Sequence, residues 1–392
     1  MAKNRKYDIV LFGATGFTGE LTAQYLASQG DSNLTWAIAG RNRARLEQVR
    51  QGLAAINPAC ADIDILLADA GDAAALKEVA AAASVIITTV GPYIRYGEAL
   101  VAACAECGTD YVDLTGEPEF VDRMWLAYQE QAQSSGARIV TSCGFDSIPH
   151  DLGALFTVQQ LPEGVPIEVE GFVRAGGDIS GGTWHSAITA FSRLRKTIEA
   201  GKQRRARESW PSDRRIGSTQ QGIRYSKVLG SWVVPFPGID PQVVRRSAAS
   251  DERYGPAFRY GHYIQVKSLP KVAALVGGAS LAMLGAQFKF TRRKLLKFRD
   301  PGNGPNAETR AKAWFRVRFI GKGGGKQVIT EVTGGDPGYG ETAKMLAESA
   351  MCLAKDRLPK RSGLLTPATA MGDKLIKRLQ KAGIGFTVVE SN

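Results

Sequence analysis

Short apolar runs alternate with longer amphipathic segments through the first 150 residues of the chain. The apolar runs predict strands at 7–12, 35–39, 64–68, 84–90, 110–113 and 138–142. Apolar residues spaced three or four apart predict helices at 20–29, 43–55, 73–82, 98–107 and 119–134. Strands that are apolar on both faces and alternate with helices are typical of a parallel sheet covered on both sides. The pattern therefore predicts an α/β domain of the Rossmann type over residues 1–150.

The pattern changes after Cys143. Segments 167–175 and 313–333 alternate apolar with polar residues, as antiparallel strands with one wet face do. We therefore expect a second, α+β domain over residues 151–335, built on an antiparallel sheet. Predicted helices at 341–356 and 370–382 lie in a C-terminal segment, residues 336–392, which we expect to pack back on the Rossmann domain.

One uncharged segment stands apart. Residues 272–288 contain 17 positions without a charge, between Lys271 and Lys289, and Arg and Lys recur as far as residue 299. As a helix this segment is about 25 Å long, short of the roughly 30 Å hydrocarbon core of a bilayer, which disfavours a membrane span. Two interpretations remain open: a helix buried against the second sheet, or a peripheral membrane contact through 272–299, with the cations facing anionic headgroups.

Length and charge add to this picture. A chain of 392 residues exceeds what one core supports, and its 44% hydrophobic and 22% charged content is typical of globular proteins. The net charge of +12 is uneven: residues 1–150 carry 11 Lys/Arg against 18 Asp/Glu, which leaves 39 against 20 for the rest. The basic part predicts either a solvated surface or a site for an acidic partner, such as an anionic membrane or an acyl carrier. We expect no nucleic-acid binding, because no recognition module or aromatic platform is recognisable.

The same alternatives apply to residues 193–215, which are dense in Arg and Lys. We interpret this stretch as a solvated helix and loop, or as a docking surface for an acidic partner. Five scattered cysteines and no secretory signal favour a cytoplasmic protein. The pair Cys104 and Cys107 lies within a predicted helix without a second pair, so we expect no metal site.

A glycine-rich turn joins the first strand to the first helix. It runs Gly13-Ala14-Thr15-Gly16-Phe17-Thr18-Gly19. Gly13 permits a tight turn, Gly16 permits a close approach of the backbone to a pyrophosphate, and Gly19 permits close helix packing. The helix N-terminus offers N–H groups to the phosphates. Residues 13–18 are therefore candidate dinucleotide-binding residues.

The residues that follow the next strands indicate which dinucleotide is bound. Arg41 and Asn42 follow the second strand where NAD-binding sites place an acidic residue, and an arginine there suits a 2′-phosphate, which favours NADP(H) over NAD. We expect Asp69 near the adenine, with a helix cap as the alternative, and Gly91, Pro92 and Tyr93 near the nicotinamide ribose.

Two further segments are candidates for the reacting centre. Residues 143–151 follow the last predicted strand of the first domain, and the glycine-rich loop 176–185 follows the first strand of the second. They contain His150 and His185, which either donate protons or have structural roles.

Several of these motifs, in this order, resemble the saccharopine dehydrogenase-like oxidoreductases, and within them most closely the bacterial trans-acting enoyl reductases. The resemblance covers nearly the whole chain and includes, besides the glycine turn, the motifs at 89–93, 111–117, 143–151, 180–183, 299–302 and 335–340. It implies NADPH-dependent reduction of an α,β-unsaturated acyl thioester carried on a synthase in lipid or polyketide synthesis. Hydride would reach the β-carbon, and Tyr93, Asp146 and His150 are our candidates for stabilising the enolate and protonating the α-carbon.

Two alternatives differ in function class. One is a membrane- or lipid-associated relative whose nucleotide site is regulatory or non-catalytic. The other is an amino-acid-type dehydrogenase, although an amino dicarboxylate substrate gives no reason for the apolar segment 272–288.

Overall fold

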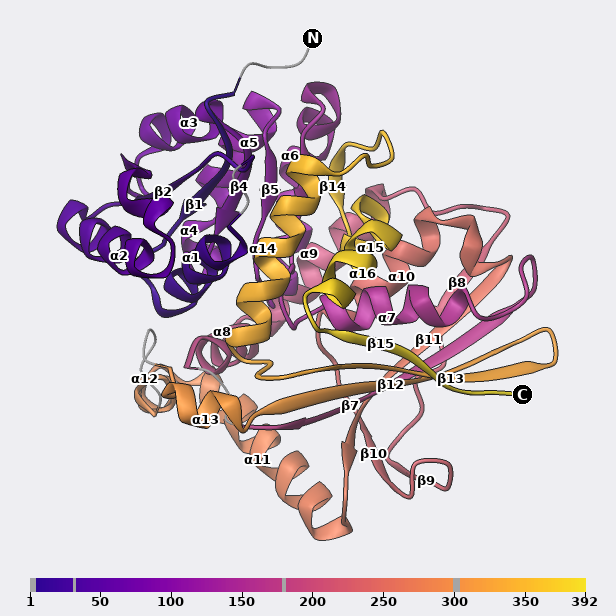
Figure 1. The fold of residues 1–392 in the computed structure, drawn as a ribbon. Helices are drawn as coiled ribbons and strands as arrows, with labels where there is room; N and C mark the ends of the chain where they lie inside the picture. Colours follow the sequence, from indigo (N-terminus) through magenta and orange to yellow (C-terminus); the bar gives the residue numbers. More distant parts are fainter. Residues whose placement is uncertain (1–4, 31–32, 178–180, 299–303) are drawn as a thin grey trace.

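The first domain is built on a parallel sheet. A computed structural model describes residues 5–30, 33–177, 181–298 and 304–392. Within these residues the sheet has seven strands in the order β14-β6-β5-β4-β1-β2-β3, and every neighbouring pair is parallel (Figure 1). The strands are β1 (Tyr7–Phe12), β2 (Trp36–Gly40), β3 (Asp64–Leu67), β4 (Ala83–Thr88), β5 (Asp110–Val112), β6 (Arg138–Val140) and β14 (Gly363–Leu365). The order reverses between β1 and β4, the position at which open α/β sheets bind ligands.

Helices cover both faces of this sheet because the strands are apolar on both sides. Ile9 and Leu11 of β1 belong to one buried cluster, and Val10 and Phe12 belong to another. The first cluster includes residues of α1 (Phe17–Gln29), α2 (Arg43–Ile56) and α14 (Gly340–Lys355), and the second those of α3 (Ala73–Ala82), α5 (Glu98–Cys107) and α6 (Pro118–Ser135). The predicted α/β domain is confirmed.

The second domain is built on a mixed sheet. In the described residues its order is β15-β13-β12-β7-β11-β10-β9, with β8 pairing only β11. The strands are β7 (Ile167–Gly176), β8 (Arg215–Ser218), β9 (Arg224–Ser226), β10 (Ser231–Pro235), β11 (Ala257–Val266), β12 (Trp314–Gly323), β13 (Lys326–Gly334) and β15 (Gly385–Ser391). The second sheet was predicted to be antiparallel, but β11 runs parallel to β7 and β8. The long connection between β7 and β11, which contains helices as well as the strands β8, β9 and β10, returns the chain to the same end of the sheet and so permits a parallel pair.

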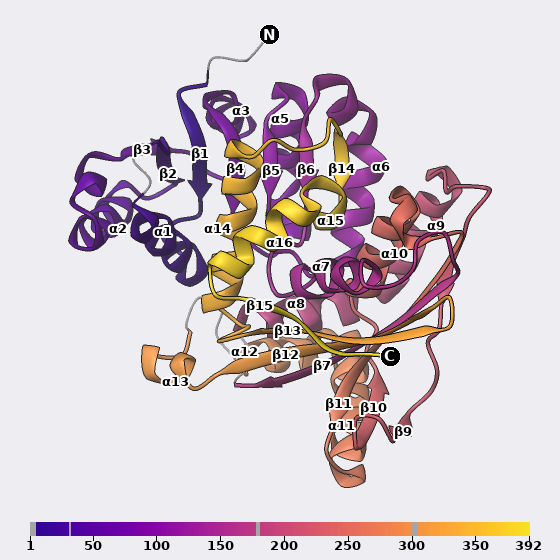
Figure 2. The same cartoon turned by 45° about the vertical axis from the view of Figure 1, so that its right-hand side comes forward.

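Two helices pack on the inner face of the second sheet (Figure 2). They are α7 (Ile148–Val158), which contacts β7, β12 and β13, and α10 (Asp240–Ser250), which contacts α7 and β11. Gly153 lets the α7 backbone approach the sheet, since a Cβ there would lie 2.3 Å from the Phe319 ring. The loop that enters α7 therefore lies between the parallel sheet and the mixed one.

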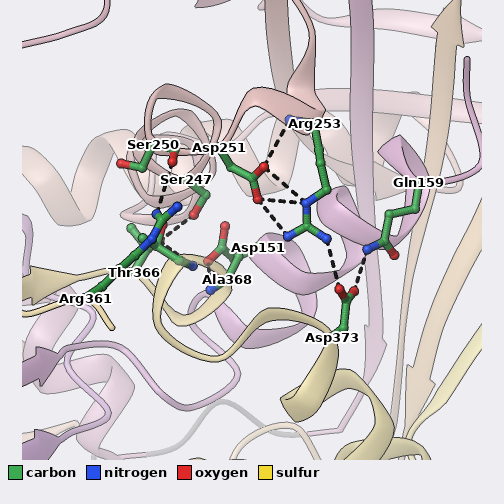
Figure 3. Close-up of polar contacts among 11 residues, drawn as sticks. Asp151, Gln159, Ser247, Ser250, Asp251, Arg253, Arg361, Thr366, Ala368 and Asp373 are labelled. Atoms are coloured by element: carbon green, nitrogen blue, oxygen red, sulfur yellow. Dashed lines mark hydrogen bonds and ion pairs between the residues drawn. The ribbon is translucent and has the colours of Figure 1, made fainter. Parts of the chain in front are cut away.

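The C-terminal residues belong to both domains. Helix α14 packs against β4, β5 and α1, β14 completes the parallel sheet beside β6, and β15 forms one edge of the mixed sheet beside β13. Residues 366–373 are fastened to α7 and α10 by polar contacts (Figure 3). The Asp151 carboxylate accepts from the Ala368 N–H at 2.8 Å, and the Ser247 and Thr366 hydroxyls lie 2.6 Å apart.

The Arg- and Lys-rich stretch 193–215 is only partly solvated. It forms α9 (Leu194–Arg207), which packs on α6. The Arg204 guanidinium is 4% exposed and pairs with Asp122 of α6 at 3.1 Å. Arg193 donates to both carboxylate oxygens of Glu119 at 2.7 and 2.6 Å. The predicted solvated helix is therefore wrong for Arg193 and Arg204, whose acidic partners lie in the same chain.

The apolar segment is a helix exposed to solvent. It forms α11 (Leu269–Gln287), in which Val272 and Ala286 are buried, and α12 (Lys289–Lys297) follows it. Among the described residues, α11 is the one helix long and apolar enough to cross a membrane, yet only 11% of it is buried. The interpretation as a helix buried against the sheet is therefore wrong.

Candidate active site

The glycine-rich turn has the geometry of a phosphate-binding turn. Gly13 has φ +93°, a conformation that favours glycine. A Cβ on Gly19 would lie 2.1 Å from the Gly13 carbonyl oxygen, so the helix approaches the turn as closely as the spacing predicts. Gly16 is the N-cap of α1, and no side chain caps the helix. The first N–H groups of α1 are thus left for another acceptor, which fits a pyrophosphate.

The other residues of the turn have different environments. Ala14 is fully buried, whereas Thr15 and Thr18 are half-buried. The ring of Phe17 packs edge-on against Tyr339 at 4.8 Å between centroids, and the Arg310 guanidinium lies 5.4 Å from the Phe17 ring. Residues from the end of the chain therefore contact the side chain that follows the turn.

At the ends of β2 and β3, the Arg41 side chain is exposed and has one weak ion-pair contact. The Arg41 side chain is 83% exposed, and its guanidinium lies 3.8 Å from the Asp69 carboxylate. Asn42 caps α2 by accepting from the Arg45 N–H. Asp69 accepts from the Gly71 N–H, while Asp72 caps α3, so the alternative of a helix cap at Asp69 does not apply. The free face of Arg41 suits a phosphate, for which Asp69 is a competing partner.

The turn after β4 is held by a glutamate from the turn after β5. The Glu117 carboxylate accepts from the N–H groups of Tyr93 and Ile94 at 3.1 and 2.9 Å. The Gly91–Pro92 peptide bond preceding them is cis. The Tyr93 side chain is 4% exposed, and its hydroxyl donates to the Thr88 carbonyl at 3.0 Å. The geometry thus places the Tyr93 hydroxyl inside the parallel-sheet domain, in a role that holds the turn.

The loop between β6 and α7 carries backbone strain. Ser142 and Ser147 have φ +63° and +103°, which side-chain-bearing residues rarely adopt. Such strain is maintained by surrounding contacts and concentrates at functional sites. Here the Cys143 N–H donates to the Asp113 carbonyl at 2.6 Å, and the Phe145 N–H donates to the Thr342 hydroxyl at 3.0 Å. The loop is thereby fixed between β5 and the start of α14.

Asp146 lies at the centre of this strained loop. Its side chain is partly exposed, and a Cβ on Gly116 would lie 2.7 Å from its Oδ2. The carboxyl therefore sits against the turn after β5, at the carboxyl edge of the parallel sheet. Glycine at 116 makes room for it.

Behind Asp146, a buried polar cluster joins three elements. His150 of α7 lies 3.0 Å from Asp240 of α10, measured from Nδ1 to Oδ1. His262 of β11 lies 3.8 Å from the other Asp240 oxygen, and the two imidazole centroids are 4.9 Å apart. The Tyr260 hydroxyl lies 3.1 Å from the His262 Nδ1. His150 Nε2 and His262 Nε2 are buried and make no hydrogen bond within the described part of the chain.

The two carboxyls of this region have opposite pKa shifts. Burial raises the pKa of Asp146 to about 7, and the negative charge of Asp240 adds to that rise. Burial also opposes ionisation of Asp240, but its charge interaction and hydrogen bond with His150, and to a smaller extent its interaction with His262, outweigh burial and lower the Asp240 pKa to about 2. Burial lowers the pKa of His262 to about 3. Neighbouring carboxyls with separated pKa values are a pattern of acid–base sites, in which the group of higher pKa holds the proton.

The structure brings together some of the predicted reacting residues and not others. Asp146 and His150 are near enough for the charge of His150 to act on the Asp146 carboxyl, whereas the Tyr93 hydroxyl is engaged elsewhere. His185 is half-buried in α8 (Gly181–Ser192). Residues 178–180 of the loop 176–185, Ser180 of the motif 180–183 and the motif 299–302 lie outside the described residues.

Sequence reasoning missed Asp240, His262 and Glu117 as site residues. Asp240 directly precedes a proline, and His262 stands among aromatic and apolar residues, so the sequence around each has an ordinary structural interpretation. The chain has three histidines, and His262 is the one that was not named as a candidate; the scarcity of histidine is the signal that could have identified it. Glu117 lies within the motif 111–117, but its link to Tyr93 depends on the sheet order.

Comparisons with known proteins identify the family of the chain. Residues 9–140 match the family described as the saccharopine dehydrogenase NADP binding domain. A trans-acting enoyl reductase of Mycobacterium ulcerans is 37% identical over 409 residues, and one of Mycobacterium tuberculosis is 36% identical over 413, with 97% of each chain covered in both cases. The apo saccharopine dehydrogenase of Saccharomyces cerevisiae is 13% identical, with a TM-score of 0.57 over 98% of this chain and 100% of the yeast chain, a likeness of fold.

Proposed function

The chain belongs to the saccharopine dehydrogenase-like NADP-dependent oxidoreductases, in the group of the trans-acting enoyl reductases, and from this we propose that it reduces an α,β-unsaturated acyl thioester. In this proposal a separate carrier presents the thioester, which is consistent with relatives that are named trans-acting. The observation that carries the proposal is the Asp146 carboxyl, which lies against Gly116 at the carboxyl edge of the parallel sheet and whose pKa is raised by burial and by the charge of Asp240. Reduction of a carbon–carbon double bond needs one proton besides the hydride, and Asp146 can supply it.

The residues present fit an NADP cofactor. The glycine turn at 13–16 and the uncapped start of α1 would hold the pyrophosphate, and the exposed Arg41 would hold the 2′-phosphate. Gly91 and Pro92, at the end of β4, would lie near the nicotinamide ribose. When bound, NADPH supplies the hydride for the β-carbon.

Asp146 is the proton donor in this proposal. With a pKa of about 7 and a partly exposed carboxyl, it holds a proton in about half of the molecules at neutral pH. Transfer of that proton to the α-carbon forms the new C–H bond and leaves a carboxylate, which regains a proton from solvent. The anionic Asp240 raises the Asp146 pKa and the charge of His150 lowers it, so both are positioning residues that set the acidity of the donor.

An isotope experiment tests the reaction. We expect the purified protein to oxidise NADPH with an enoyl thioester of pantetheine. Cofactor deuterated at the transferable position should place one deuterium at the β-carbon, and D₂O should place one at the α-carbon. Oxidation of NADPH with an imino acid, and not with any enoyl thioester, would show that the protein is an amino-acid-type dehydrogenase. NADPH binding without turnover of either class would favour the non-catalytic alternative.

A further inference from the structure

The α11–α12 hairpin, residues 269–297, is an apolar surface that the fold leaves in water. Nine consecutive residues of α11, 273–281, are all exposed, although they include Leu275, Val276 and Leu281. Leu281, Leu284, Phe288 and Phe290 are 72%, 63%, 68% and 71% exposed. Both views show α11 projecting from the end of the molecule opposite to the parallel sheet (Figures 1 and 2).

The composition of α11 does not match its surroundings. A helix on the surface of a soluble domain has one apolar stripe and one polar face, whereas a helix that is apolar all round lies in a core or in a membrane. Residues 272–288 have no charged side chain on any face. Contiguous exposed apolar surface of this kind marks a site of interaction with a partner or a lipid phase.

The charge around the hairpin identifies the partner. Residues 267–298 contain seven Lys and Arg and no Asp or Glu, and four of the seven cations lie between Arg292 and Lys297. Lys289, Arg293, Lys294 and Lys297 of α12 are exposed. Exposed leucine and phenylalanine next to a purely cationic segment fit a bilayer with anionic headgroups, into which apolar residues insert while the cations remain at the phosphates.

The topology excludes a simple span. Strand β11 precedes the hairpin and β12 follows it, and both pair with β7 in the same sheet. The two ends of the hairpin are therefore on the same side of any membrane. A span would need a second crossing between residues 288 and 313, and the described part of that interval contains only the basic α12 and the short α13 (Ala307–Ala311).

We propose that the α11–α12 hairpin docks the protein on an anionic bilayer surface, with the apolar helix in the interface and the basic helix against the headgroups. The hairpin rests on α8, since the Trp184 indole N–H donates to the Leu295 carbonyl at 2.6 Å. The same helix reaches the candidate site, where Ser186 donates to Glu117 at 3.4 Å. Helix α8 therefore connects the docked hairpin to the candidate site, and the docking proposal does not depend on which reaction the site performs.

Vesicle co-sedimentation of the full chain tests the proposal. We expect binding to vesicles that contain phosphatidylglycerol, little binding to pure phosphatidylcholine, and release by salt. Leu281→Glu should weaken binding at least about tenfold, because it places a charge in the inserted face. Replacing Lys289, Arg293, Lys294 and Lys297 by Gln should weaken binding by roughly fivefold for each charge removed.

A matched variant distinguishes specific docking through the hairpin from a general effect of the net charge of the protein on vesicle binding. Replacing four exposed cations of α9, Arg195, Lys196, Lys202 and Arg205, by Gln removes the same charge and should leave vesicle binding almost unchanged. Equal loss in both quadruple variants would overturn the proposal, as would wild-type protein that does not bind anionic vesicles. A dimer in sedimentation equilibrium that Leu281→Glu dissociates, without vesicle binding, would show instead that a second copy covers the hairpin.

Discussion

Replacing Asp146 by Asn should abolish the proton donor and stabilise the protein at high pH. The Asp146 pKa is raised from 3.8 to about 7, so the folded chain holds this proton more tightly than the unfolded chain does. As the pH rises from about 4 to about 7, the unfolded state loses the proton first, and wild-type stability falls. A rise of about 3 in pKa corresponds to about 4 kcal/mol, at about 1.4 kcal/mol for each unit. Because solvent reaches part of the carboxyl, we expect about half of that, about 2 kcal/mol.

Asn removes this cost because it has no proton to lose. Urea unfolding should show that the stability difference between Asp146→Asn and wild type grows by about 2 kcal/mol between about pH 4 and about pH 8. The rate of enoyl reduction in single turnover should fall by about 10² to 10⁴-fold, the range expected for general acid catalysis. The wild-type rate should decline above about pH 7, as the donor ionises.

The exposed Asp62 provides a matched control. Asp62→Asn removes the same charge at the surface of the same domain, and neither its rate nor the pH dependence of its stability should differ from wild type. The reasoning would be refuted if Asp146→Asn kept its activity, or if its stability differed from wild type by the same amount at every pH.

Three further substitutions test other parts of the structure. Arg41→Glu should weaken NADPH binding about 100-fold in calorimetry, since a phosphate contact worth about 2–3 kcal/mol is lost, while NADH binding changes little; equal losses for both would place the 2′-phosphate elsewhere. Tyr93→Phe should cost about 1 kcal/mol in urea unfolding, because the Thr88 carbonyl loses its donor, and leave the rate within about threefold; a 100-fold slower rate would make Tyr93 the acid. Asp122→Ala should cost about 3 kcal/mol, because the Arg204 and Arg246 guanidiniums lose a shared buried partner; a loss below about 1 kcal/mol would mean that Glu208 alone neutralises them.

Local pattern was sufficient to predict the six strands of the first domain that lie within residues 1–150, but not β14, which comes from residues 363–365. Each of these strands is a short apolar run that ends in a turn signal. Because consecutive strands are connected through helices, the order of the strands along the chain largely determines which strands are neighbours in the sheet. The predicted limits of the helices 73–82 and 98–107 coincide with those observed. The glycine turn belongs to the same class of local signal, because its function depends on residues within one turn of each other.

The strand pairing of the second domain depends on tertiary contacts that the hydrophobic periodicity of the sequence does not reveal. Strands β8 and β9 have only four and three residues, too short for alternation to be recognisable. The parallel pairing of β11 with β7 depends on the path of the long connection between them, which contains three strands besides its helices. The location of helix α11 could not be predicted from the sequence for a different reason. A helix in a protein core and a helix in a lipid interface both remove the same apolar groups from water, and only the tertiary structure distinguishes the two locations.

The candidate reacting centre was predicted only in part, because some of its residues are close in sequence and others are brought together by tertiary contacts. Asp146 and His150 lie four residues apart and could be named from one motif. Asp240 and His262 come from a helix and a strand of the other domain, and Asp240, which adds to the rise of the Asp146 pKa, lies more than 90 positions away in sequence. No sequence pattern links them, because burial of the group follows from how α7, α10 and β11 pack.

The late position of β14 has a consequence for synthesis of the protein. Strand β6 ends at Val140, and the strand that completes the sheet beside it begins at Gly363. While the intervening chain is on the ribosome, β6 is an open edge and the face covered by α14 is bare. Open edges and bare apolar faces are the surfaces through which nascent chains aggregate. The cofactor half therefore reaches its finished form only when residues 340–365 have emerged, and a nonsense mutation before residue 340 should yield aggregated protein rather than a trimmed enzyme.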